Sequence, residues 1–286
     1  MDRKKEFEGE RIAKKLARAG VASRREVERM VEAGRVTVNG KKISSPALNV
    51  TGRDAITVDG RLIGAAEPAR LWRYHKPSGL VTTARDEKGR ATVFERLPEE
   101  LPRVMSVGRL DLTSEGLLLL TNDGELKRKL ELPSTGWVRK YRVRANGNAS
   151  DTRLAPLREG MVIDNERFQP MSVEYDKQSG ANVWLTIGIR EGRNREIRRA
   201  LEEVGLTVNR LIRISYGPFQ LGDLARGAVE EVRPKILRDQ LGIKREPDDG
   251  GPAQQREKPK PRGASRAVTR PGASMRGRPR GKNSSG

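Results

Sequence analysis

The chain has 286 residues, room for one large or two modest domains, and carries 58 Lys and Arg against 38 Asp and Glu, a net charge of +20. This balance favours a polyanionic partner, most often a nucleic acid. With no cysteine and a single histidine, the composition excludes disulfides, iron–sulfur clusters and the usual structural zinc sites, and it argues against a His-dependent hydrolase.

The N-terminal thirty residues are dense in charge, and the apolar runs further along are short. We therefore expect neither a secretory signal nor a membrane-spanning segment, and we expect a cytoplasmic protein. The sequence also contains no phosphate loop and no dinucleotide fingerprint, so we expect no cofactor and no metal.

Residues 10–63 predict a small unit of two helices followed by a short sheet. Apolar residues at helical spacing form the first helix pattern, and Ser23 with Glu26 three residues later predicts the capped start of the second. Alternating valines then lead into Asn39-Gly40, which is typical of a hairpin turn, and a further strand is expected near Ile56.

A polar stretch at 65–70 is the expected linker to a second unit, residues 71–241. Strands are predicted at 71–75, 80–83, 103–109, 117–121, 140–145, 168–175, 182–189, 208–215 and 229–232. Helices are predicted at 93–97, 125–132, 152–158 and 194–204. Many strands broken by a few helices indicate an α+β domain built on a largely antiparallel sheet with flanking helices.

The last stretch, residues 244–286, differs from the rest in composition. It holds 12 Lys and Arg, 4 Asp and Glu, 6 Pro and 7 Gly, with hardly any large apolar side chain. We expect it to be a disordered basic tail, because it cannot bury enough surface to offset its ordering entropy. It either holds phosphates without sequence preference or only aids solubility.

The segment 107–116 reads Val-Gly-Arg-Leu-Asp-Leu-Thr-Ser-Glu-Gly and is followed by four leucines. Arg109 and Asp111 are two residues apart, so on an extended strand they point to the same side. A carboxylate beside a guanidinium stays ionised and can serve as a nucleophile or base. The alternatives are an Asp that orders a turn and an Arg in a weak surface ion pair.

This segment closely resembles the catalytic motif of the RNA pseudouridine synthases that carry an N-terminal S4 RNA-binding domain. Further segments match in the same order, at 74–79, 140–143, 191–199, 210–213 and 216–218, with the S4 likeness carried by 18–25 and 32–40. The resemblance covers roughly residues 10 to 240. It implies isomerisation of a chosen uridine to pseudouridine in ribosomal RNA, without a cofactor.

The resemblance also implies roles for four residues. Asp111 would be the catalytic carboxylate, and Tyr141 would stack on a uracil flipped out of its helix. Arg109 would pair with Asp111 or position it. Arg198 would pair with Asp111 or a substrate phosphate, with Arg195 and Arg199 as rivals for its role. The alternatives are a half-buried strand tyrosine and exposed arginines.

In the S4 unit, the likeness places a group of basic side chains on or near the RNA-facing side: Lys14, Lys15, Arg18, Arg24, Arg25 and Arg35. The alternative is that they are ordinary solvated helix charges.

The stretch 89–98 and the basic tail most resemble the branch of the family that acts on the large ribosomal subunit. The expected partner is ribosomal RNA, either free or within an assembling subunit. A small-subunit enzyme shares the architecture. A non-catalytic RNA-binding or ribosome-assembly protein is the alternative of a different class, although a pure binder gains nothing from a carboxylate facing a polyanion. We expect a monomer.

Overall fold

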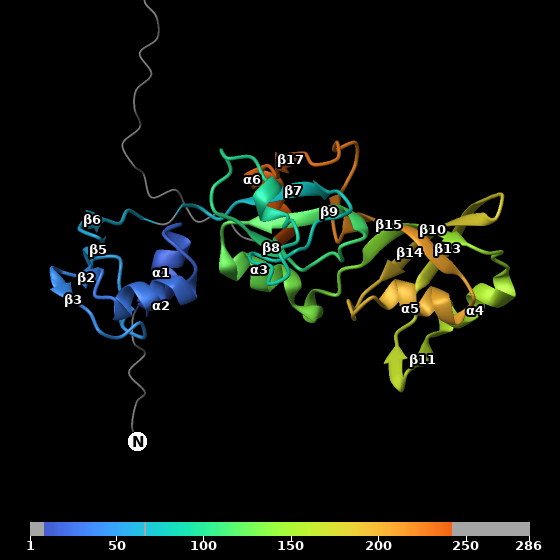
Figure 1. Cartoon of the computed structure of the whole chain (residues 1–286), viewed down its shortest axis with the longest axis horizontal. Coiled ribbons are helices and arrows are strands. Elements are labelled where there is room, and N and C mark those ends of the chain that lie inside the picture. The colour runs from blue at the N-terminus through green and yellow to red at the C-terminus, as the bar shows by residue number, and fades with distance from the viewer. Residues whose placement is uncertain (1–8, 66, 242–286) are drawn as a thin grey trace, which may run out of the picture. The chain divides into compact units, whose positions relative to one another are not determined.

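The computed structural model describes residues 9–65 and 67–241 of the chain (Figure 1). The predicted basic tail, 244–286, lies outside the described residues. None of the helices in these two ranges is long and apolar enough to cross a membrane.

The N-terminal unit contains the predicted helix pair and small sheet. Its elements are β1 (Glu10–Arg11), α1 (Ile12–Arg18), α2 (Arg24–Glu32), β2 (Val36–Val38), β3 (Lys41–Lys42), β4 (Asn49–Val50), β5 (Ile56–Val58) and β6 (Arg61–Leu62). The side chain of Ser23 accepts a hydrogen bond from the Glu26 backbone N–H at 3.2 Å, as the capping pattern predicted. Ile12, Leu16 and Val27 are fully buried and hold the helices on the sheet.

The second unit contains a nine-stranded sheet among the described residues, with the order β13-β14-β10-β15-β9-β7-β17 and with β8 on β9 and β16 on β15. Its strands are β7 (Leu71–Lys76), β8 (Met105–Val107), β9 (Ser114–Thr121), β10 (Arg139–Asn146), β13 (Ser172–Ser179), β14 (Asn182–Ile189), β15 (Thr207–Tyr216), β16 (Phe219–Gln220) and β17 (Val229–Glu231), and β11 (Met161–Ile163) and β12 (Glu166–Phe168) form a separate hairpin.

The helices of this unit are α3 (Gly124–Glu131), α4 (Asp151–Glu159), α5 (Glu196–Glu203) and α6 (Pro234–Leu241), with short 3₁₀ turns at Phe94–Arg96 and Pro133–Thr135. Helix α4 packs against β13 and α5 against β15 (Figure 1). The predicted α+β class with a largely antiparallel sheet is confirmed.

One strand pair departs from the antiparallel pattern. Strands β9 and β15 run parallel over three residues, where Arg213 lies opposite Gly116. Gly116 has φ +100, and a Cβ there would lie 2.7 Å from the backbone nitrogen of Arg213 and closer still to its carbonyl oxygen. A glycine is required at this position because only a residue without Cβ allows the two backbones to approach so closely.

Strand β9 lies inside the sheet, between β15 and β7. All eight of its residues are buried, and its four leucines form the continuous apolar run expected of a strand covered on both faces. Leu118 and Leu120 pack into the core that includes Tyr141, whereas Leu117 and Leu119 pack into the core that includes Tyr216. The strand therefore fixes the loop before it relative to both cores.

Two strand predictions were wrong. Residues 80–83 form no strand, because Val81 makes only an isolated bridge with Thr92. The stretch 168–175 divides into the end of β12 and the start of β13, since Pro170 between them has no N–H for a ladder. The expected helix at 93–97 is a 3₁₀ turn, in which the backbone N–H of Glu95 donates to Thr92 Oγ1 at 3.3 Å and that of Thr92 to the Glu95 carboxylate at 3.1 Å.

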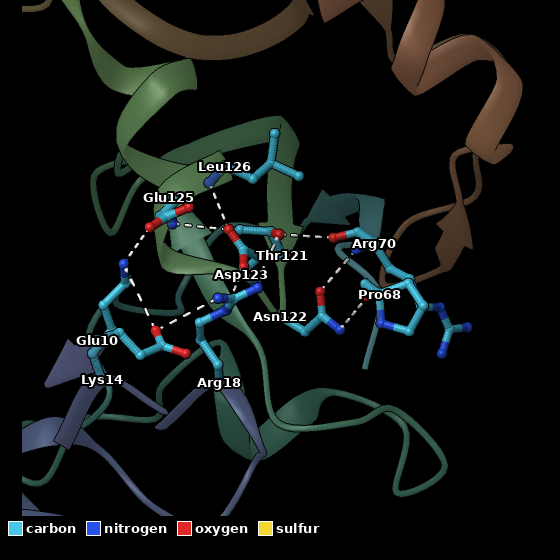
Figure 2. Close-up of polar contacts among 10 residues, drawn as sticks. All are labelled: Glu10, Lys14, Arg18, Pro68, Arg70, Thr121, Asn122, Asp123, Glu125 and Leu126. Atoms are coloured by element: carbon cyan, nitrogen blue, oxygen red, sulfur yellow. Dashed lines mark hydrogen bonds and ion pairs between the residues drawn. The ribbon is translucent and has the colours of Figure 1, made fainter. Parts of the chain in front are cut away.

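The end of β9 joins the linker to α3 (Figure 2). Asp123 accepts hydrogen bonds from the backbone N–H groups of Glu125 and Leu126, at 2.9 and 2.8 Å, and so caps the start of α3. Beside it, Thr121 Oγ1 donates to the Arg70 carbonyl at 2.7 Å. The Asn122 side chain accepts from the Arg70 N–H, which holds the approach to β7 in place.

Candidate active site

A cavity of about 270 Å³ opens beside the parallel pairing of β9 with β15. The loop 108–113, between β8 and β9, forms one wall, and β10, β15 and the start of α5 form the others. Of the predicted site residues, Arg109, Asp111 and Tyr141 line it. Residues far apart in sequence thus converge where, among the described strands, the pairing changes from antiparallel to parallel.

The chain around Asp111 is a turn and not a strand, so the predicted placement of Arg109 and Asp111 on one strand face was wrong. Strand β8 ends at Val107, and Gly108 has φ +66, a left-handed conformation that bends the chain. Arg109 is exposed and Asp111 half-buried, and within the described part of the chain the two form no ion pair. The backbone N–H of Ser114 closes the turn by donating to the Asp111 carbonyl at 3.0 Å.

The buried side chain of Lys76 holds the backbone of this turn by hydrogen bonds. Its side chain is fully buried, and its Nζ donates to the carbonyl oxygens of Pro77, Asp111 and Ser114 at 3.0, 3.1 and 2.9 Å. Burial lowers the pKa of Lys76 to about 8, while the charges of Asp111 and Glu115 act in the opposite direction. The ammonium group therefore fixes the backbone that carries Asp111. The sequence signal was a lysine at the end of an apolar strand, and we did not single it out.

Tyr141 lies on β10, opposite Ile187 of β14 on one side and Arg213 of β15 on the other. Its side chain is 8% exposed, and it lines the cavity. The position suits a ring that covers one face of a bound base, and its stacking role stays a prediction.

Arg198 braces the same turn from α5. Its Nη2 donates to Thr113 Oγ1 at 3.1 Å and its Nη1 to the Val208 carbonyl at 3.3 Å. Burial and the charge of Arg195 lower the pKa of Arg198, and the charge of Asp111 raises it. The structure thus places Arg198 near Asp111 but behind the cavity wall, while its rival Arg195 lines the cavity.

The other rival, Arg199, is engaged elsewhere. It forms ion pairs with Asp164 at 3.0 Å and with Glu166 at 2.6 Å, on the β11–β12 hairpin. It therefore connects α5 to that hairpin and is not among the residues that line the cavity.

Three residues that the sequence reasoning missed also line the cavity: Arg139, Glu196 and Arg213. Arg139 donates to the Tyr216 hydroxyl at 3.1 Å. Glu196, the first residue of α5, is 3% exposed and accepts the backbone N–H of Arg193 at 2.9 Å. Burial raises the pKa of Glu196 to about 7. For Glu196, the sequence signal was a glutamate within a run of arginines.

The predicted RNA-binding residues of the S4 unit lie on α1, α2 and the turn before β2. Lys14 pairs with Glu10 at 3.8 Å and with Glu125, and Arg18 pairs with Asp123 at 3.3 Å (Figure 2). Lys15 donates to a backbone carbonyl, Arg35 pairs with Asp59 at 2.6 Å, and Arg24 and Arg25 are exposed. Their contact with RNA stays a prediction.

Comparison with known proteins agrees with the geometry. Residues 70–203 match the family model of RNA pseudouridylate synthases, and residues 10–56 match that of the S4 domain. An uncharacterized RNA pseudouridine synthase of Rickettsia felis is 49% identical over 228 residues, which is 80% of this chain and 99% of that protein. The chain therefore belongs to the RNA pseudouridine synthase family and is an isomerase, as the motif resemblance predicted.

Named relatives include the ribosomal large subunit pseudouridine synthase B of Haemophilus influenzae, 42% identical over 246 residues, 82% of this chain and 69% of that protein. The same-named protein of Shigella flexneri is also 42% identical, over 230 residues, 78% of this chain and 79% of that one. A crystal structure of a pseudouridylate synthase shares the fold, with a TM-score of 0.54 and 24% identity over 79% of this chain and 96% of that one.

Proposed function

We propose that this chain converts a uridine of large-subunit ribosomal RNA to pseudouridine, with Asp111 as the catalytic carboxylate. The observation that carries the proposal is the position of Asp111 on the cavity wall, in a turn whose backbone Lys76 holds through two carbonyls and Arg198 through Thr113. A carboxylate that must act on one ribose or base needs such a fixed backbone, because small misplacements cost large factors in rate.

The size and lining of the cavity suit a single flipped base. At about 270 Å³ it lies near the lower limit of ligand pockets, which begin at roughly 300 Å³. Tyr141 offers a ring for stacking, which offsets the few kcal/mol needed to take a base out of its helix. The buried leucines around β9 exclude water from the sheet beneath.

Exposed cations around the cavity suit the phosphates next to the target nucleotide. Arg109, Arg193 and Arg195 are exposed, and all three line the opening. Contacts of this kind position RNA without reading its sequence. Together with the basic side chains of the S4 unit they contribute to the net charge of +20, which suits a polyanionic partner.

The choice of the large ribosomal subunit is supported by the names of relatives that are 42% identical over most of this chain. Because those relatives are bacterial, we also propose that the chain acts in the bacterial cytoplasm, on ribosomal RNA or an assembling subunit.

The test maps pseudouridine in unmodified large- and small-subunit ribosomal RNA after incubation with the full chain and no added cofactor. Three proteins are compared: wild type, Asp111→Asn, and Asp223→Asn as a matched control at an exposed aspartate. We expect one new site in large-subunit RNA with wild type and control, and none with Asp111→Asn.

Other outcomes overturn separate parts of the proposal. A new site in small-subunit RNA contradicts the choice of subunit. A site that persists with Asp111→Asn contradicts the role of Asp111. Tight, salt-sensitive binding without any new site, on RNA and on partly assembled particles, favours an assembly factor.

A further inference from the structure

Arg213 is a buried cation on the cavity wall for which the described residues supply no carboxylate. It is 2% exposed, and β15 holds it between Gly116 of β9 and Tyr141 of β10. Its Nε donates to the Leu117 carbonyl at 2.7 Å. Its Nη2 is buried and has no hydrogen-bond partner among the residues that the structure describes.

A buried guanidinium without a carboxylate is disfavoured unless another group supplies the missing negative charge, because buried charges in proteins are normally paired and hydrogen-bonded. The Tyr216 ring, with its centroid 5.2 Å from the guanidinium carbon, offsets part of the charge but accepts no conventional hydrogen bond from Nη2. The same strand shows the usual solution three residues earlier, where Arg210 pairs with the buried Glu115 at 2.9 Å. Arg213 is thus suited to a negative charge that arrives with the substrate.

The reaction creates such a charge at a defined moment. Whichever atom Asp111 attacks, the bond between C1′ of the ribose and N1 of the uracil must break, and its electron pair stays on the base. The resulting negative charge spreads to the carbonyl oxygens O2 and O4. When C5 then bonds to C1′, the proton lost from C5 is balanced by one gained at N1, so nothing is oxidised or reduced.

A fixed donor that faces this charge lowers the barrier because it needs no reorganisation as the charge develops. The exposed arginines around the cavity are better placed for the phosphates, which remain in solvent, whereas Arg213 is buried in the wall next to Tyr141. The burial of the guanidinium strengthens its interaction with an anion in the cavity, since little water screens it.

We propose that Arg213 is a further catalytic residue, whose guanidinium donates to a carbonyl oxygen of the flipped uracil and stabilises the anion formed when the glycosidic bond breaks. The proposal rests on the proposed use of the Asp111 cavity as the uridine site.

The test compares Arg213→Met and Arg213→Lys with wild type, and uses Arg210→Met as a matched control on the same strand. Single-turnover conversion is measured on RNA that carries either uridine or 5-fluorouridine at the target position, as loss of the N-linked nucleoside after digestion. Fluorine withdraws electrons, so the detached fluorouracil anion is less basic and depends less on a neighbouring cation.

We expect Arg213→Met to slow conversion of uridine by about 10²–10³-fold and conversion of 5-fluorouridine by at least about tenfold less. Arg213→Lys, which keeps the charge, should lie between Arg213→Met and wild type. Arg210→Met should affect both substrates equally and weakly.

Equal slowing of both substrates by Arg213→Met and Arg213→Lys would indicate a structural role and overturn the proposal, as would an unchanged rate on uridine. If melting curves show that Arg213→Met does not fold, the ratio of the two substrates with Arg213→Lys decides by the same criterion. Failure of the proposed function is recognised separately, because wild type would then form no pseudouridine in large-subunit RNA, or Asp111→Asn would still form it.

Discussion

Replacement of Glu196 by Gln should make the folded protein more stable at pH 8 and leave its stability nearly unchanged at pH 4.5. Glu196 lines the cavity with a 3% exposed side chain, and its Oε1 has no hydrogen-bond partner among the described residues. Burial is the main cause that raises the pKa of this carboxyl from 4.5 to about 7, and the charge of Glu191 raises it further.

The size of the effect follows from linkage between protonation and folding. Below pH 4.5 the carboxyl is protonated in both the folded and the unfolded state. Between pH 4.5 and about 7 the unfolded chain releases a proton that the folded chain retains, so the free energy of unfolding falls as pH rises. At about 1.4 kcal/mol per pH unit, the loss reaches roughly 3 kcal/mol and persists above pH 7.

Glutamine keeps the acceptor for the Arg193 N–H and removes the titration. Urea unfolding of the full chain at pH 5 and pH 8 should therefore show a stability gain for Glu196→Gln that grows by roughly 2–3 kcal/mol between the two pH values. Glu203→Gln, at an exposed position of the same helix, is the control and should change stability by less than about 0.5 kcal/mol. A gain that is equal at both pH values would refute the reasoning.

Two further substitutions test how the turn before β9 is held. Gly116→Ala should lower the free energy of unfolding by about 2–4 kcal/mol in urea, because its Cβ would overlap the backbone of Arg213 at positive φ; wild-type stability would contradict the close approach of β9 and β15. Lys76→Met should reduce the rate of pseudouridine formation by about 10²-fold or more, since the backbone of Asp111 loses its donor. A wild-type rate for a folded Lys76→Met protein would show that the lysine does not position the turn.

Local features of the sequence predicted local structure well. Ser23 starts α2 with the expected hydrogen bond, and Thr92 with Glu95 makes the reciprocal pair that a capping box requires. These signals succeed because the interacting groups lie within one turn of each other. The four leucines after Gly116 likewise predicted a strand, although not that β9 is buried on both faces.

Single glycines and prolines caused the errors in predicting strands from the alternation of side chains. The strand expected at 103–109 ends at Val107, since Gly108 takes a left-handed conformation that alternation of side chains does not reveal. Pro170 divides the strand predicted at 168–175, because proline has no backbone N–H to donate to a neighbouring strand. In both cases one residue changed the direction or the pairing of the backbone. The side chains that follow it therefore do not lie where an uninterrupted strand would place them.

What the sequence alone determined is the family, the catalytic carboxylate as a candidate, and the order of the elements, because motifs and caps are contiguous in the chain. What only the tertiary structure decided is which groups surround Asp111. Lys76 reaches the Asp111 carbonyl across 35 residues, and Arg213 reaches the Leu117 carbonyl across 96. Such partners are selected by strand order and register, above all by the parallel pairing of β9 with β15. No spacing within a single segment encodes that pairing.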